Sequence, residues 1–82
     1  MDYSKRIENA HSQIGNVKSK VARRDLLMML RATKAAYTKM DKESVECRRL
    51  RKETVRYREL HQNFQELLAH LEKHITFASL LN

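Results

Sequence analysis

The stretch of sequence that decides the fold is residues 57–81, YRELHQNFQELLAHLEKHITFASLL. It belongs to a ladder of mostly apolar residues that recur every three, four or seven positions. The ladder comprises Leu50, Tyr57, Leu60, Phe64, Leu67, Leu71, His74, Ala78 and Leu81. This spacing returns side chains to one face of an α-helix. Because such a face needs another helix to cover it, the sequence predicts a protein built by helix packing.

A second ladder lies in the N-terminal quarter of the chain. It comprises Tyr3, Ile7, Ala10, Ile14, Val17 and Val21. Gly15 and Asn16 are the helix-breaking pair within it. Two interpretations of this pair stay open. Gly15 ends a short first helix as a C-cap, or one longer helix tolerates it at a cost of about 1 kcal/mol.

Residues 25–40 are apolar on all sides of the expected helix, beginning with LLMML at 26–30. A helix of this kind must contact more than one neighbour. We expect the main packing contacts of the first half of the chain to come from Leu26, Met29, Leu30 and Tyr37. In the second half we expect them from Leu60, Phe64, Leu67, Leu71 and Ile75.

The best internal break lies at residues 38–44, where Thr38, Asp41 and Ser44 can each act as a helix N-cap. We therefore predict an all-α fold with one helical domain over residues 1–82. It would contain a helix at about 3–38, a connection at about 39–43 and a helix at about 44–80. The two long helices would form an antiparallel hairpin or a bundle or coiled-coil assembly. The alternative is one near-continuous helix in a coiled coil.

The phase of the two ladders favours a bundle over a simple coiled coil. Ile7 and Ile14 share one heptad position, whereas Phe64 and Leu71 fall one residue later in the count. A strict two-stranded coiled coil keeps its phase or marks each shift with a stutter. Two helices that pack on each other and on a partner fit this drift better.

Charge is distributed unevenly along the chain. The net charge is +7, of which residues 1–58 carry +9 and residues 59–82 carry −2. The densest cationic cluster comprises Arg48, Arg49, Arg51, Lys52, Arg56 and Arg58. Like charges repeated at i,i+4 on one helix repel each other. We interpret the cluster either as a solvated face or as a contact surface for an acidic partner.

Few residues suggest chemistry. Cys47 is the one cysteine, so an internal disulfide is excluded and a reducing compartment is expected. His70 and His74 lie at i,i+4 with Glu66 one turn earlier, but no further metal ligand is near in sequence. A glycine-rich phosphate loop and a nucleophile elbow are both absent from the sequence. We expect a protein that is not an enzyme and uses no cofactor or metal.

The sequence contains no run of roughly 18 apolar residues, which a membrane-spanning helix requires. The N-terminal residues also lack the apolar stretch of a signal peptide. We therefore expect an intracellular, cytoplasmic protein, and a nuclear location stays open.

The expected function is a helical assembly or scaffold module. Its apolar seam would pack against helices of a copy of itself or of another protein. The predicted seam comprises Ile7, Ile14, Val17, Val21, Leu26, Met29, Leu30, Tyr37, Leu50, Tyr57, Leu60, Phe64, Leu67, Leu71, Ile75, Ala78 and Leu81. The alternative is binding of nucleic acid or an acidic surface by a basic helix at residues 48–58. Nucleic acid is less favoured, because the cluster contains a single aromatic residue on its apolar side.

Overall fold

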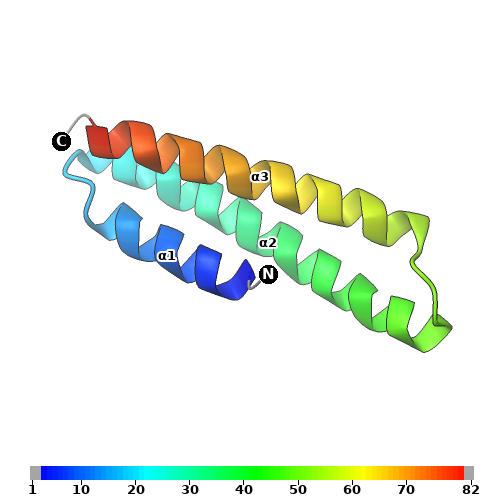
Figure 1. Ribbon diagram of the computed structural model, residues 1–82. Helices are drawn as coiled ribbons and strands as arrows, with labels where there is room; N and C mark the ends of the chain where they lie inside the picture. The colour runs from blue at the N-terminus through cyan, green and yellow to red at the C-terminus, as the bar shows by residue number, and fades with distance from the viewer. Residues whose placement is uncertain (1–2, 81–82) are drawn as a thin grey trace.

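The computed structural model describes residues 3–80 as three α-helices: α1 (Tyr3–Gly15), α2 (Lys20–Leu50) and α3 (Val55–Leu80) (Figure 1). The predicted all-α class is confirmed, but the predicted count of two helices is wrong. Figure 1 shows α2 and α3 as an antiparallel hairpin with α1 packed along half of its length. The described part of the chain measures 48 × 18 × 16 Å.

The first correction concerns the start of the chain, where a short helix and a connection replace the first part of the predicted helix at 3–38. α1 ends at Gly15, and the Val17 N–H donates to the Ile14 carbonyl at 3.1 Å. Ser19 then caps α2, because its Oγ accepts the Ala22 N–H at 3.2 Å. Ile14 and Val17 are both buried, so the apolar periodicity continues across a break in the helix.

Gly15 does not end α1 through a left-handed conformation. Its φ is not positive, and no atom outside its own stretch of helix lies within 4 Å of the position of a Cβ atom there. The glycine therefore ends the helix through low helix propensity rather than as a left-handed C-cap.

The second correction concerns the turn between the long helices, which lies at residues 51–54 and not at 39–43. The Thr38 Oγ1 donates to the Lys34 carbonyl at 3.1 Å, so it does not cap a new helix. Met40 is buried in the core, which keeps α2 intact through the predicted connection. α2 ends instead at Leu50, and its C-cap is Arg51, whose φ of 56° and ψ of 36° are left-handed.

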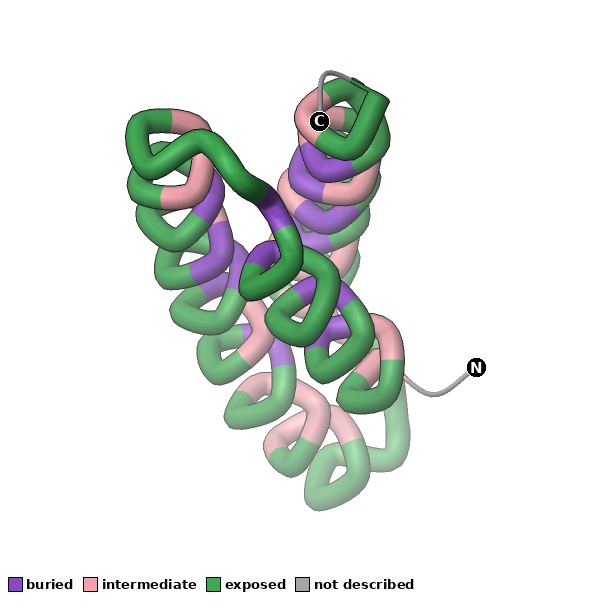
Figure 2. Tube along the Cα trace, turned by 90° about the vertical axis from the view of Figure 1, so that its left-hand side faces the viewer, coloured by how far each residue is buried: buried purple, intermediate pink, exposed green. Residues whose placement is uncertain are grey.

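The core lies between the facing stripes of the three helices (Figure 2). Its fully buried apolar residues are Ile7, Ala10, Ile14, Val17, Leu26, Leu30, Ala36, Met40, Phe64, Leu68, Leu71 and Ile75. Phe64 lies at the centre, with ring centroids 4.9 Å from Tyr3 of α1 and 5.3 Å from Tyr37 of α2. One buried polar residue, Thr33, satisfies its hydroxyl by donating to the Met29 carbonyl at 2.8 Å.

The end of the hairpin near residues 51–54 is thinner than the rest. None of the residues between Met40 and Phe64 is fully buried. α1 begins near the middle of the hairpin and runs away from this part of it (Figure 1). We call residues 41–60 the hairpin tip, a layer of two helices without a third to cover it.

Candidate interaction surfaces

Most of the predicted seam is covered within this one chain. The fully buried members are Ile7, Ile14, Val17, Leu26, Leu30, Phe64, Leu71 and Ile75, and the partly buried members are Met29, Tyr37, Tyr57, Leu60, Leu67 and Ala78. Val21 and Leu50 are exposed, by 73% and 39%. Leu81 lies outside the described residues. The two predicted ladders therefore pack on each other, with α1 beside the hairpin.

Neither the two ladders nor the predicted seam includes four residues of the core. They are Thr33, Ala36, Met40 and Leu68. Leu68 is adjacent to Leu67, and the two cannot both lie at the centre of one stripe. The buried stripe of α3 contains Phe64, Leu68, Leu71 and Ile75, which are spaced by four, three and four residues. This spacing was visible in the sequence, but the heptad count pointed to Leu67.

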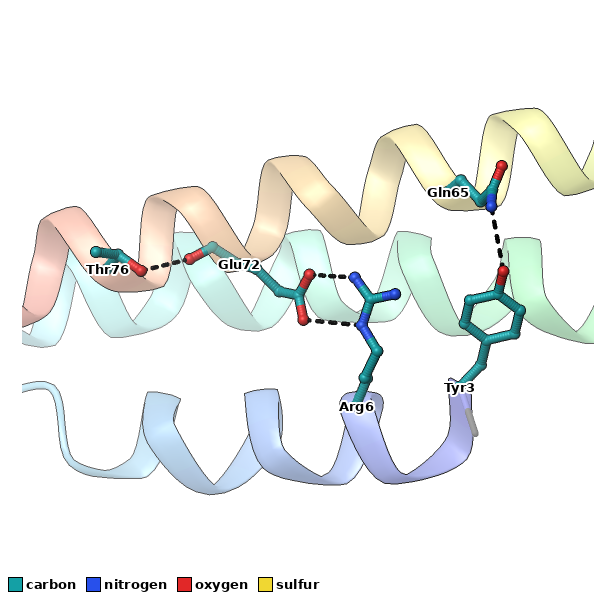
Figure 3. A network of polar contacts seen from close by, with 5 residues as sticks. All are labelled: Tyr3, Arg6, Gln65, Glu72 and Thr76. Atoms are coloured by element: carbon teal, nitrogen blue, oxygen red, sulfur yellow. Dashed lines mark hydrogen bonds and ion pairs between the residues drawn. The ribbon is translucent and has the colours of Figure 1, made fainter. Parts of the chain in front are cut away.

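A polar network fixes α1 against α3 (Figure 3). The Arg6 Nε and Nη2 atoms donate to the two carboxylate oxygens of Glu72 at 3.2 and 2.5 Å. The hydrogen bond to Glu72 raises the pKa of Arg6. The Tyr3 hydroxyl accepts from the Gln65 amide at 3.2 Å and hydrogen-bonds to His61 Nε2 at 3.0 Å. These contacts set the position of α1 along the groove between α2 and α3.

The cationic cluster at 48–58 does not form the single basic helix that the sequence predicts. It spans the end of α2, the turn at 51–54 and the first turn of α3. Its cations are distributed over three backbone segments that reverse direction at the turn. The prediction of one continuous basic helix at residues 48–58 is therefore wrong.

Half of these cations form ion pairs. Arg49 pairs closely with Glu46, and this hydrogen bond lowers the pKa of the Glu46 carboxyl. The other two pairs are Arg56 with Glu43 at 3.8 Å and Arg58 with Glu53 at 3.7 Å. Within residues 3–80, Arg48, Arg51 and Lys52 form no ion pair. These three cations of the cluster are also exposed to solvent.

A depression of about 330 Å³ lies at the hairpin tip, and we call it the tip pocket. Its lining residues are Ser44, Cys47, Arg48, Lys52, Glu53 and Tyr57. The Tyr57 ring stacks on His61 with centroids 5.6 Å apart, and His61 in turn contacts Tyr3 of α1. The tip pocket therefore lies next to the N-terminal end of α1.

A second depression, of about 520 Å³, lies on the first half of α2. Its lining residues are Lys20, Arg23, Arg24, Leu27, Met28 and Arg31. We call this the α2 basic face. Leu27 is 39% exposed and Met28 is 62% exposed, so two apolar side chains stand among four cations. The sequence predicts neighbours on all sides of this helix, whereas Leu27 and Met28 are exposed.

Two further features are the arrangement of possible metal ligands and the apolar character of the helices. Within residues 3–80, no group of three or more His, Cys, Asp or Glu side chains could hold a metal ion. The rings of His70 and His74 lie 4.2 Å apart, and the buried His74 Nδ1 atom has no hydrogen-bond partner. None of the three helices, as far as they are described, has the length and apolar composition needed to cross a bilayer.

Comparison of this chain with protein-family models, with curated proteins and with solved structures finds no match in any of the three.

Proposed function

We propose that this chain is a non-enzymatic protein-binding module that holds an acidic helical segment of a partner at the hairpin tip. One observation carries the proposal. α1 fills the groove between α2 and α3 over only part of its length, and the unfilled part presents cations that form no ion pair within residues 3–80.

The tip pocket continues the surface on which α1 packs. On α2, Tyr37, Ser44 and Arg48 lie at i, i+7 and i+11, a spacing that places them on one side of a helix. Tyr37 contacts α1 through a hydrogen bond of 3.3 Å between its hydroxyl and the Ser4 Oγ atom. On α3, Tyr57 extends the aromatic contacts of His61 and Tyr3 beyond the end of α1.

The length of the uncovered surface suits a short helix. α1 has 13 residues and α2 has 31, which at about 1.5 Å per residue gives about 20 Å and about 46 Å. Because Ser4 of α1 contacts Tyr37, the part of α2 that extends past α1 is residues 38–50. These residues are about 20 Å long, the length of a helix of about 13 residues. A partner helix of that size would complete the three-helix cross-section that α1 provides elsewhere.

The charges around the tip pocket indicate which side chains the partner helix must carry. In the covered part, α1 supplies a cation, Arg6, and α3 supplies the acid, Glu72. In the uncovered part, the hairpin supplies Arg48 and Lys52, and the one acid in the lining, Glu53, already lies 3.7 Å from Arg58. A complementary partner therefore presents carboxylates beside an apolar stripe that covers Tyr57.

Binding of a peptide probe tests this proposal. The probe is a helix of about 13 residues with leucine every three or four positions and glutamate on both flanks. A matched peptide carries lysine in place of glutamate. Fluorescence anisotropy should detect binding of the acidic peptide alone, and the affinity should fall as salt rises. Reaction of the Cys47 thiol with a thiol reagent should also slow when the peptide is bound, because Cys47 lines the pocket.

Two double variants of equal charge locate the binding surface. Arg48→Gln with Lys52→Gln should weaken the acidic peptide about tenfold or more, since each charged contact contributes about 1 kcal/mol or more. Lys20→Gln with Arg24→Gln removes the same charge from the α2 basic face and should leave the affinity within about twofold. If both variants lost the same affinity for the acidic peptide, net charge alone would explain the binding, and this result would contradict the proposal. Preference for a single-stranded oligonucleotide over the acidic peptide would favour nucleic-acid binding instead.

A further inference from the structure

We propose that the α2 basic face binds peripherally to the surface of a membrane that contains anionic lipids. This function is separate from peptide binding at the tip pocket, because the two surfaces lie on different halves of α2 and share no residue. The proposal rests on the placement of apolar and cationic side chains on the outer side of the helix.

The residues of this face form one stripe. Lys20, Arg24, Leu27 and Arg31 lie at i, i+4, i+7 and i+11, and Met28 lies beside Leu27. The buried stripe of the same helix contains Leu26, Leu30 and Thr33, about a third of a turn away. Every residue of the α2 basic face except Arg23 is exposed. The α2 basic face therefore points away from the core.

The face is strongly cationic. Residues 20–31 contain four cations and one acid, Asp25, which gives a net charge of +3. Within residues 3–80, Lys20, Arg24 and Arg31 form no ion pair. Arg23 is held near the connection at 16–19, because its Nη1 atom donates to the Val17 carbonyl at 3.2 Å. Asp25 is exposed and does not line the depression.

The same end of the bundle also exposes further apolar side chains. The last turn of α3 lies beside the start of α2 (Figure 1), and Phe77 and Leu80 there are 52% and 76% exposed. Val21, next to Lys20, is 73% exposed. Exposed apolar side chains next to Lys and Arg are typical of helices that lie in a membrane interface. The apolar groups enter the boundary of the acyl chains while the cations reach lipid phosphates.

The shape of the face favours a bilayer over a partner helix. All six residues that line this depression come from α2 alone, whereas the tip pocket has walls from both helices and from the turn between them. A groove with two walls can hold a helix. A single outward helix face has no second wall, but its exposed side chains can reach a flat lipid surface. They are Lys20, Arg24, Leu27, Met28 and Arg31.

Co-sedimentation with lipid vesicles tests the proposal. The full chain should bind vesicles that contain phosphatidylcholine and phosphatidylserine, and it should not bind vesicles of phosphatidylcholine alone. Binding should weaken as salt rises, because screening shortens the range of the attraction. Equal binding to both kinds of vesicle, or to neither, would overturn the proposal.

Three double variants separate the contributions. Arg24→Gln with Arg31→Gln should weaken vesicle binding about tenfold or more. Leu27→Gln with Met28→Gln should weaken it severalfold if these side chains enter the bilayer, and unchanged binding would refute that insertion. Arg48→Gln with Lys52→Gln should leave vesicle binding unchanged. An equal loss in this last variant would show attraction by net charge alone and would overturn the assignment to α2.

Circular dichroism should show the same helicity in all three variants, because the substituted residues are exposed and glutamine is a good helix former. The acidic-peptide assay on the same proteins keeps the two proposals independent. If the α2 variants lose vesicle binding but bind the acidic peptide normally, the two surfaces act separately, as proposed.

Discussion

Replacement of Phe64 by alanine should destabilise this protein more than almost any other single truncation. The Phe64 side chain is 0% exposed and contacts aromatic rings from both other helices, Tyr3 of α1 and Tyr37 of α2. Deletion of a buried phenylalanine ring costs about 3–5 kcal/mol. At about 0.05–0.15 kcal/mol per residue, a chain of 82 residues has a free energy of unfolding of about 4–12 kcal/mol. The Phe64→Ala variant should therefore lose between a quarter and all of its stability.

Urea denaturation followed by far-ultraviolet circular dichroism measures this effect. Phe77→Ala is the matched control, because it deletes the same ring from the same helix at a position that is 52% exposed. The control should lose less than about 1 kcal/mol. Similar shifts of the two midpoints would refute the assignment of Phe64 to the core. Each protein should be measured at two concentrations. A midpoint that rises with protein concentration would show that the seam is completed between chains rather than within one.

Three further substitutions test the local structure. Gly15→Ala should stabilise the protein by about 0.4–1 kcal/mol in the same urea assay, because φ is not positive there and the Cβ atom meets no neighbour within 4 Å. Arg51→Gly should stabilise it by up to about 1 kcal/mol, because Arg51 has a left-handed φ of 56°; a loss of stability would contradict the left-handed C-cap. A double-mutant cycle with Arg6→Gln and Glu72→Gln should give a coupling free energy of about 0.2–1 kcal/mol that falls with salt, since both side chains are about one-third exposed.

The periodicity of the sequence determined the fold class and most of the core. Steps of three and four residues placed Ile7, Ile14, Val17, Phe64 and Leu71 on inward faces, and all five are buried. This works because a helix repeats every 3.6 residues regardless of its partner. The same regularity concealed the first break, since the apolar pattern continues from Ile14 to Val17 across a turn that Ser19 caps.

The end of α2 could not be located from local signals. Arg51 adopts the left-handed conformation that glycine or asparagine usually occupies, so residues 51–54 contain no conventional stop signal. Residues 38–44 contain three residues suited to N-caps, yet burial of Met40 and tertiary packing keep that stretch helical. Local propensity is worth a few tenths of a kcal/mol per residue, and packing of a whole helix face exceeds it.

The candidate surfaces were even harder to predict from the sequence than the turns, because they depend on tertiary structure. The sequence alone showed that residues 48–58 are cationic, but it did not show that the turn divides them or that α1 stops short of them. The exposure of Leu27 and Met28 was also hidden, because an apolar run does not show which of its sides faces the core. By itself, the sequence determined that this chain forms helices with apolar faces. Only the tertiary structure decided that those faces cover one another and that two cationic surfaces stay exposed. The physical reason is that burial depends on which helices meet in space.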